Sequence, residues 1–245
     1  MAESTAARSA QSSLVIGFDA DDTLWHNEIF YRQAADKFKA LLAPHKDPAQ
    51  TAKILSEIEI RNVAVYGYGF KSYTLSMIEA AVRITEGRAT AEVFDAVLDI
   101  GRSMLDGELL LFEGARSTLT ALSGKFPLVL ITKGDLMEQS TKVRRSGLAG
   151  FFRSIEIVED KTPASYRALL EKIGVEAPRF LMVGNSLKSD ILPVLEIGAR
   201  AVFVPYEHTW VHEHADGGGH TYYEIESLTQ LPELVAGLTV EAPPR

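Results

Sequence analysis

The stretch that decides the fold runs from Leu14 to Leu24 and reads LVIGFDADDTL. Its first five residues are apolar apart from Gly17, without polar alternation, which is typical of a strand buried on both faces. Polar residues follow at once: Asp19, Asp21, Asp22 and Thr23. Ligands of open α/β sheets bind beyond the carboxyl ends of the strands. The sequence therefore places these acids at a candidate binding site.

Side-by-side carboxylates repel each other unless a cation or a shared proton relieves the repulsion. Asp19 and Asp21 stand two residues apart, so in extended backbone their side chains share a face. Two carboxylates in different environments can divide nucleophilic and acid–base roles. The ordinary alternative is a solvated acidic turn after a strand.

Composition limits the class of protein. A chain of 245 residues with 46% hydrophobic and 24% charged residues suits one globular domain, or a core domain with an insertion. The net charge of −8 argues against nucleic acid and against an anionic membrane as partners. The absence of cysteine excludes disulfides, thiolate zinc sites and a cysteine nucleophile. Residues 1–13 lack the apolar segment of a signal peptide. We expect a disordered tail there and a cytoplasmic protein.

The spacing of apolar residues changes to a helical pattern after Leu24. It predicts helices over 27–42, from Asp47-Pro48 onward, over 72–85 and over 91–105. Aromatic residues and glycines at 66–70 interrupt the pattern and predict a loop. Residues 25–107 thus read as an all-helical unit.

Strands and helices alternate beyond Phe112. Strands are expected at 127–132, 154–158, 180–183 and 201–204, and helices at 113–123, 135–146, 163–173, 188–197 and 227–238. This alternation predicts an α/β fold, a doubly wound Rossmann-like parallel sheet of five or more strands with right-handed crossovers. The helical unit interrupts it after the first strand. The expected domains are therefore a core of 14–24 and 108–245 and an inserted helical domain of 25–107.

Thr132 ends the second predicted strand and is followed by Lys133 and Gly134. In register with Asp19, its hydroxyl and the backbone N–H groups that follow can hold a phosphoryl oxygen. A threonine here can equally bond to nearby backbone.

Two later strand ends also carry polar residues. Lys161 follows the third strand, where a lone lysine is usually solvated. Gly184 and Asn185 follow the fourth strand, and Asp190 begins the next helix. The glycine permits close backbone approach, while the helix dipole alone favours an acid in a first turn.

In their order along the chain, these segments resemble the four motifs of the haloacid dehalogenase-like (HAD) superfamily. The matching residues are Asp-x-Asp-x-Thr at 19–23, Thr132, Lys161, and the segment from Gly184 to Asp190. The resemblance covers roughly residues 14 to 205, and the helical unit stands where the family has its C1 cap.

The resemblance implies a magnesium-dependent phosphatase. Asp19 would attack phosphorus and form an aspartyl-phosphate, and Asp21 would act as general acid and then general base. Mg²⁺ would be held by Asp19, a backbone carbonyl of Asp21, and Asp190, while Lys161 and Thr132 would hold the phosphoryl group. Family members that dehalogenate generally lack an acid at the position of Asp21. Asp22 then reads as a bystander, and Thr23 as a brace for the loop backbone.

One position departs from the family pattern. Asn185 stands where the family commonly has an acid. Its amide can still ligate magnesium or bond to a metal-bound water, but it supplies no charge, so Asp190 becomes the main ligand of this motif.

Substrate selection is expected in and near the helical unit. The candidates are Trp25, His26, Tyr68, Lys133 and Gly134, although the aromatic residues can equally serve core packing. A small phosphorylated metabolite is the expected substrate, and a monomer or homodimer the expected assembly. His208, His212, His214 and His220 match no compact zinc pattern and suit a mobile surface or a subunit contact. Three other functions stay open: a dehalogenase, a phosphomutase and a non-catalytic binding protein.

Overall fold

The computed structural model describes residues 14–210, 213, 215–216 and 219–240. The expected tail of 1–13, together with His212 and His214, lies outside them. The described residues form two compact units. The sheet unit comprises those within 1–26, 110–132 and 143–245, and the helical unit comprises 27–109 and 133–142. The domain boundaries expected from the sequence stay a prediction.

The sheet unit contains the α/β fold that the sequence predicted. Its six described strands are β1 (Val15–Phe18), β2 (Leu128–Lys133), β3 (Ser154–Val158), β4 (Phe180–Gly184), β5 (Arg200–Phe203) and β6 (Tyr223–Glu224). They lie in the order β3-β2-β1-β4-β5-β6. β1 runs parallel to both of its neighbours, with Phe18 opposite Leu130 on β2 and Val183 on β4. The first motif therefore leaves from the centre of the sheet.

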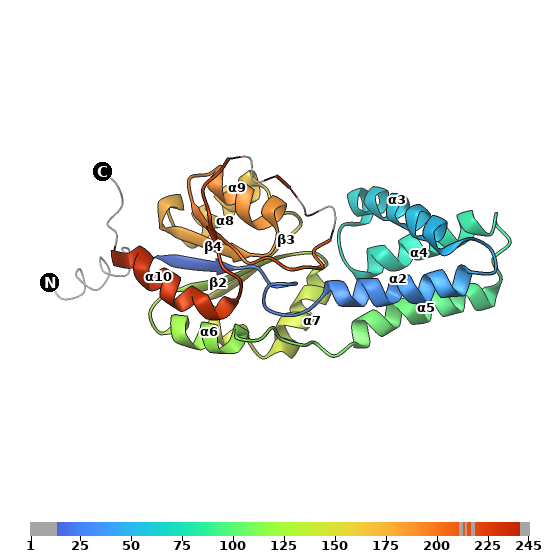
Figure 1. The fold of residues 1–245 in the computed structure, drawn as a ribbon, viewed down its shortest axis with the longest axis horizontal. Helices are drawn as coiled ribbons and strands as arrows, with labels where there is room; N and C mark the ends of the chain where they lie inside the picture. Colours follow the sequence, from blue (N-terminus) through green and yellow to red (C-terminus); the bar gives the residue numbers. More distant parts are fainter. Residues whose placement is uncertain (1–13, 211–212, 214, 217–218, 241–245) are drawn as a thin grey trace. The chain divides into compact units, whose positions relative to one another are not determined.

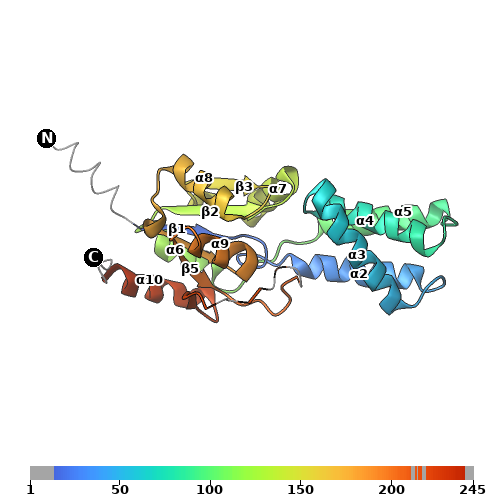
Figure 2. The same ribbon diagram turned by 90° about the horizontal axis from the view of Figure 1, so that it is seen from above.

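Helices cover both faces of this sheet, which explains why its central strands are apolar throughout. Figures 1 and 2 show α8 (Pro163–Ile173) and α9 (Leu192–Leu195) on one face, and α6 (Ala115–Ser123) and α10 (Leu231–Val240) on the other. One buried cluster joins β-strand side chains such as Phe180 to Tyr166 on α8. The strands and helices that alternate in the sequence thus form a layered α/β domain.

Four helices make up most of the helical unit: α2 (Glu28–Leu42), α3 (Pro48–Tyr66), α4 (Phe70–Ile84) and α5 (Ala91–Asp106). α3 begins as the sequence predicted, because the Asp47 carboxylate accepts the N–H groups of Ala49 (2.9 Å) and Gln50 (3.2 Å) and Pro48 follows the cap. The four helices bury one common cluster, with Phe38, Ile58 and Met77 fully enclosed. This unit has its own core. The remaining helix, α7 (Leu136–Ser146), contributes residues to both units.

Two sequence expectations need correction. The helix expected at 188–197 is a π-helical turn over Leu187–Ile191 followed by the four-residue α9, because the turn is shaped by side-chain bonds to its own backbone. The helix expected at 227–238 begins with a 3₁₀ turn at Leu228–Gln230 before α10. The strand β6 was not expected at all, since two residues are too few to show a periodicity.

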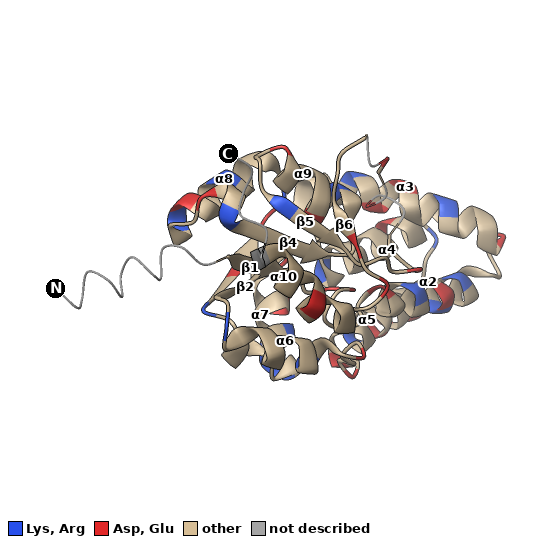
Figure 3. Ribbon diagram, turned by 60° about the vertical axis from the view of Figure 1, so that its left-hand side comes forward, with Lys and Arg blue, Asp and Glu red and all other residues tan. Residues whose placement is uncertain are grey.

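Charges of both signs are interspersed on the helices, as Figure 3 shows for α8 and α2. No helix within the described ranges has the length and apolar character needed to cross a membrane. The cytoplasmic location expected from the sequence stays a prediction.

Candidate active site

The carboxyl end of β1 meets the corresponding end of β4. The backbone N–H of Asp19 donates to the carbonyl of Val183 at 2.9 Å, so Asp19 continues the pairing one residue beyond β1. Thr132 is buried two residues beyond the β1–β2 pairing, with 1% of its surface exposed. Topology alone therefore brings the first, second and fourth motifs to one edge of the sheet.

Asp19 is a buried carboxylate held by two donors. Its Oδ2 accepts the Thr23 hydroxyl at 2.8 Å, and its Oδ1 pairs with the Lys161 ammonium. Burial and the nearby charge of Asp190 raise the pKa of Asp19 to about 7, against the opposing effects of Lys161 and Thr23. Asp19 is thus fixed in position and lies in a place where negative charge has accumulated.

Lys161 binds both of the buried acids. Its Nζ donates to Oδ1 of Asp190 at 2.7 Å as well as to Asp19. Burial on its own lowers the pKa of Lys161, but the charges of Asp19 and Asp190 outweigh it and raise that pKa well above its usual value. Lys161 is therefore cationic. It is also buried, whereas a lone lysine is usually solvated.

Asp190 is anchored by the turn that carries it. Its Oδ2 accepts the backbone N–H of Ser186 at 3.0 Å, and only 1% of its surface is exposed. A side chain at Gly184 would place its Cβ 2.3 Å from the same Oδ2. Glycine is therefore required at position 184 to make room for the acid.

Asn185, from the fourth motif, is hydrogen-bonded to Thr23 of the first motif. Its Oδ1 accepts the Thr23 hydroxyl at 3.2 Å, and its Nδ2 donates to Thr209 Oγ1 at 3.3 Å. We expected Thr23 to brace the loop backbone, whereas its hydroxyl bonds to the side chains of Asp19 and Asn185. The Thr23 hydroxyl donates to these buried acceptors because a buried acceptor without a donor costs the free energy of its desolvation.

Asp21 lies beside Trp25. The indole Nε1–H donates to Asp21 Oδ1 at 2.7 Å, and Trp25 is fully buried. Substrate contact by Trp25, expected from the sequence, stays a prediction. The side chain is buried and bonds to Asp21. Asp22, expected as a bystander, has a φ of 62°, a left-handed conformation that aspartate tolerates.

Glu213 was missed by the sequence reasoning. Its carboxylate lies within hydrogen-bond distance of the hydroxyls of Ser186, which caps the fourth-motif turn, and Ser189, which lies within it. The Ser186 hydroxyl also stabilises the turn, since its Oγ accepts the N–H of Ser189 at 3.0 Å. Glu213 stands in a polar histidine-containing segment with no periodicity, so no sequence signal connected it with Asp190.

His26, the other candidate at the end of the first motif, belongs to an aromatic cluster of the sheet unit. Its ring centroid lies 3.9 Å from Phe112 and 5.9 Å from Tyr206, whose hydroxyl is 3.4 Å from His26 Nδ1. Burial and then the charge of His208 lower the pKa of His26. A neutral, partly exposed imidazole is therefore available there.

The remaining substrate candidates lie together in the helical unit. The Lys133 ammonium stands 4.3 Å from the centre of the Tyr68 ring, a cation–π contact. Gly134 has a φ of 134°, which only glycine adopts readily. The structure thus pairs Tyr68 with Lys133, which the sequence had proposed separately.

The oxygen atoms at the sheet edge fit a magnesium ion. Mg²⁺ prefers oxygen ligands and retains several waters. The carboxylates of Asp19 and Asp190 share one cation, Lys161, and burial followed by the charge of Asp190 raises the pKa of Asp19. Within the described ranges no group of three acidic, histidine or cysteine side chains gathers. A site formed by two carboxylates, a backbone carbonyl and water molecules contains fewer than three such side chains, so it is compatible with that finding.

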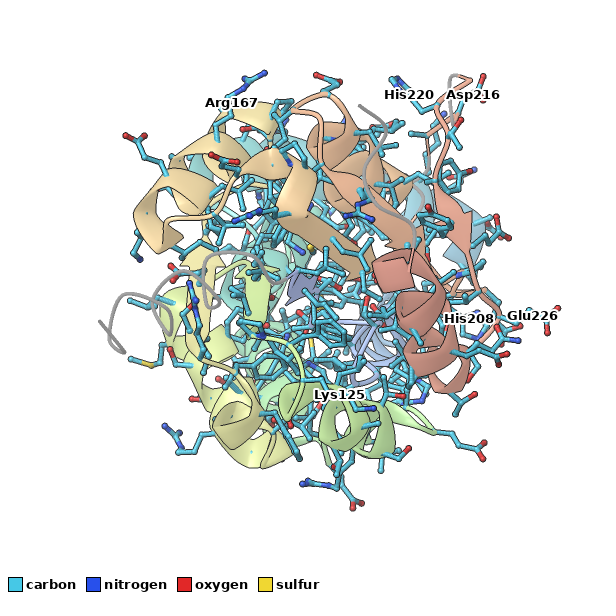
Figure 4. All side chains as sticks on the ribbon, turned by 90° about the vertical axis from the view of Figure 1, so that its left-hand side faces the viewer. Lys125, Arg167, His208, Asp216, His220 and Glu226 are labelled. Atoms are coloured by element: carbon cyan, nitrogen blue, oxygen red, sulfur yellow. The ribbon has the colours of Figure 1, made fainter. Side chains whose placement is uncertain are left out.

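The histidine-rich segment forms no comparable centre in its described part. Figure 4 shows His208 and His220 at separate places on the periphery of the sheet unit. His208 contacts Tyr206, with ring centroids 5.5 Å apart.

Curated relatives of this chain include several phosphatases. N-acylneuraminate-9-phosphatase of Mus musculus is 23% identical over 170 residues, covering 65% of this chain and 66% of that protein. The chain thus spans about two thirds of its length. Pyrimidine 5'-nucleotidase YjjG of Escherichia coli is 24% identical over 229 residues, covering 90% and 96%. Glyceraldehyde 3-phosphate phosphatase of Pyrococcus furiosus is 28% identical over 128 residues, covering 50% and 53%.

Solved structures and a family model agree on the family. A haloacid dehalogenase-like family hydrolase from Xanthomonas campestris is 36% identical, with a TM-score of 0.83 over 94% of this chain and 97% of that one. A 2-haloacid dehalogenase from Pseudomonas syringae shares the fold, at 24% identity and a TM-score of 0.61 over 92% and 99%. The haloacid dehalogenase-like hydrolase model matches residues 14–198. The chain therefore belongs to the haloacid dehalogenase-like hydrolase family.

Proposed function

We propose that the protein is a magnesium-dependent phosphatase that hydrolyses a small phosphorylated metabolite through an aspartyl-phosphate. One observation carries the proposal. Asp19 and Asp190 converge on the buried Lys161, and a second acid, Asp21, stands two residues beyond Asp19. A nucleophile, a phosphoryl-binding cation and an acid–base group are thereby assembled at one sheet edge.

In the first step, a carboxylate oxygen of Asp19 forms a bond to phosphorus while the ester P–O bond breaks. The departing oxygen takes a proton from Asp21 and leaves as an alcohol. Lys161, which pairs with Oδ1 of Asp19, offsets the negative charge of the phosphoryl group, and the Thr23 hydroxyl fixes the carboxylate through its other oxygen, Oδ2.

In the second step, ionised Asp21 removes a proton from a water molecule whose oxygen bonds to phosphorus. The bond between phosphorus and Asp19 breaks, which restores the Asp19 carboxylate and releases inorganic phosphate. The sum is phosphate ester plus water giving alcohol plus phosphate, with Asp21 protonated again.

Magnesium would be held by Asp19, Asp190 and the backbone carbonyl of Asp21, with the amide oxygen of Asn185 as a further donor. When bound, it supplies positive charge that lessens repulsion between the anionic nucleophile and the phosphate dianion. Asn185 also keeps Thr23 aligned with Asp19, a task that its amide performs without charge.

The substrate proposed is a small phosphate monoester such as a sugar phosphate or a nucleoside monophosphate. The names of the curated relatives point to this class: an acylneuraminate 9-phosphate, a pyrimidine nucleotide and a triose phosphate. Substrate contact by Trp25, His26, Tyr68, Lys133 and Gly134 stays a prediction, as does a monomeric or homodimeric state.

The test measures phosphate release from a panel of these ester classes and from p-nitrophenyl phosphate, with Mg²⁺ and with a chelator. Wild type is compared with Asp19→Asn, and with Asp22→Asn as a matched control in the same loop. Asparagine tolerates the left-handed backbone of residue 22, so Asp22→Asn is expected to retain turnover. Magnesium-dependent turnover that Asp19→Asn abolishes supports the proposal.

Each other result overturns part of the proposal. Halide release from 2-chloropropionate without magnesium would identify a dehalogenase. Conversion of a sugar phosphate to its isomer without phosphate release would identify a phosphomutase. Absence of turnover on every ester, including p-nitrophenyl phosphate, would indicate a binding protein.

A further inference from the structure

We propose that Trp25 is a positioning residue for the acid–base carboxylate of Asp21. Its indole N–H holds one carboxylate oxygen, Oδ1, so that the other, Oδ2, carries the proton exchanged with the leaving group. This inference rests on the proposed phosphatase function, which assigns the acid–base role to Asp21.

The contact between the two side chains is direct. Trp25 Nε1 lies 2.7 Å from Asp21 Oδ1, a distance typical of a charge-assisted hydrogen bond. An indole nitrogen can only donate, so its partner oxygen must act as acceptor and is not the atom that carries the acidic proton. The geometry therefore distinguishes the two oxygens of Asp21.

The tryptophan itself is immobilised. None of its surface is exposed, which makes it the largest fully buried side chain among the described residues. Asp21 is only partly buried. A rigid buried donor thus holds a partly buried carboxylate, an arrangement that restricts the rotation of the carboxylate.

The backbone around Trp25 is also tied down. The N–H of Asp22 donates to the carbonyl of Trp25 at 2.7 Å, and that of Leu24 to Ala20 at 2.8 Å. Trp25 additionally forms a bridge with Leu111, while the N–H of Phe112 donates to Leu24 at 3.0 Å. Asp21 is therefore oriented by a loop that is closed on itself and fixed to a second segment.

A general acid works only when its proton faces the departing oxygen at hydrogen-bond distance. An unrestrained aspartate would rotate its carboxylate away for part of the time. Buried tryptophans usually satisfy their N–H with some acceptor, so packing alone is the alternative explanation of this contact. The two explanations differ in how activity should depend on the leaving group.

The decisive measurement compares two esters in wild type and in Trp25→Phe. p-Nitrophenolate departs without protonation, whereas an alkoxide needs the acid. General acid–base catalysis contributes about 10² to 10⁴ in rate. Because Asp21 also serves the second step, which both esters share, the quantity compared is kcat/KM, which reports the first step alone. If positioning accounts for part of the acid catalysis, Trp25→Phe should lower kcat/KM for an alkyl phosphate by about tenfold or more, and kcat/KM for p-nitrophenyl phosphate by less than about twofold.

Two further variants separate positioning from folding. Replacing Trp25 by 3-benzothienylalanine keeps the size and shape of the ring and removes only the N–H, and should give the same selective loss. Leu119→Ala, in the core of α6 and away from the first motif, lowers stability without touching Asp21. For Leu119→Ala, the ratio of kcat/KM between the two esters should equal that of wild type.

The Asp21→Asn background completes the test. If Trp25 acts through Asp21, Trp25→Phe should cost little further activity on the alkyl ester once the acid is absent. Equal losses of kcat/KM on both esters, or a ratio of kcat/KM between the esters that benzothienylalanine leaves unchanged, would show that Trp25 only packs, and the positioning role would be overturned. Turnover of both esters by wild type would still stand as evidence for the phosphatase, so the two proposals fail separately.

Discussion

Each unit of this protein contains a buried lysine paired with a buried carboxylate, yet the lysine faces two carboxylates in the sheet unit and one in the helical unit. In the sheet unit, Lys161 contacts Asp19 and Asp190, and in the helical unit Lys142 pairs with Glu138 at 2.8 Å. All five side chains are at most 9% exposed. Burial alone therefore does not distinguish the two places.

The pair in the helical unit is balanced and held by further hydrogen bonds. Glu138 Oε2 accepts the N–H of Phe70 at 2.8 Å, while Lys142 also donates to Asn27 Oδ1 at 2.7 Å. In the sheet unit one ammonium faces two carboxylates, and burial together with the second carboxylate raises the pKa of Asp19 to about 7. The two buried lysines thus differ in the number of carboxylates that they face, and this difference, not a buried ion pair as such, favours the sheet-unit cluster as the candidate cation site.

The largest effect is expected from Lys161→Met. Removing the ammonium that contacts both acids should lower kcat by about 10² to 10³, because a fixed charge directed at the phosphoryl group is lost. The measurement is phosphate release under saturating substrate and magnesium.

Lys172→Met supplies the control for this prediction. Lys172 pairs with Glu156 at 2.6 Å in the same unit, but its side chain is 68% exposed. Activity within about twofold of wild type is expected there, since exposed pairs contribute little. A small loss of kcat in Lys161→Met would contradict the role given to Lys161.

Lys142→Met should act on stability. It leaves Glu138 buried without its counter-charge, which costs about 3–5 kcal/mol in the free energy of unfolding. Adding Glu138→Gln removes the stranded charge and should recover most of that loss. Urea unfolding of the single and double variants measures both numbers.

The surface pair Lys39 and Asp36, at 2.7 Å in the same unit, provides the reference. Lys39→Met should cost less than about 1 kcal/mol. If Lys142→Met lowered the free energy of unfolding no more than Lys39→Met does, the Lys142–Glu138 pair would contribute no more than a surface pair. The contrast between the two buried lysines would then not hold.

Glu59 extends the comparison to a partly buried carboxylate whose pKa is governed by desolvation. Desolvation raises the pKa of Glu59 from 4.5 to about 7. Between these values the folded state binds more protons than the unfolded state, so stability falls as pH rises through that window. Glu59→Gln should therefore raise the free energy of unfolding by about 1–3 kcal/mol at pH 8 and have almost no effect below pH of about 4.5.

Glu57→Gln is the matched control on the same helix. Glu57 is exposed and lies 4.0 Å from Arg83. Its effect should stay within about 0.5 kcal/mol at either pH. Equal effects of the two substitutions at pH 8 would mean that desolvation of Glu59 is negligible.

Much of the fold could be predicted because its strands are short apolar runs between helical patterns. β3 and α8 were predicted with their observed bounds, 154–158 and 163–173. Their ends are signalled locally: Thr162 caps α8 through its side chain, Pro163 follows, and Gly174 ends the helix. By contrast, the π-turn at Leu187–Ile191 has both a local bond, from the Ser189 N–H to the Ser186 hydroxyl, and a contact with the distant Glu213, which no local pattern reports.

The site shows the same division. The polar residues at the strand ends could be named from the sequence because parallel topology fixes where strand ends meet. The partners could not. Glu213 reaches the fourth motif from 24 residues beyond Ser189, and the indole of Trp25 turns toward Asp21 although both residues looked like independent candidates. Side-chain pairing of this kind depends on the folded backbone and leaves no periodic signal.

The smallest effect is expected from Asn185→Asp, which adds a third acid to the unbalanced cluster. The charge count of a site tunes its affinity for divalent cations, so the Kd for Mg²⁺ should fall by about tenfold. Calorimetric titration of metal-stripped protein measures this without any substrate. The same charge should lower the unfolding midpoint of the metal-free variant, since the introduced carboxylate would face Asp19 across the Thr23 hydroxyl.

These two effects of Asn185→Asp must appear together. A carboxylate that strengthens cation binding by adding negative charge also adds repulsion when the cation is absent. Added Mg²⁺ should therefore raise the unfolding midpoint more in the variant than in wild type. A tighter Kd without lower metal-free stability would mean that the acids are already neutralised, and charge imbalance would no longer distinguish the sheet unit's lysine from that of the helical unit.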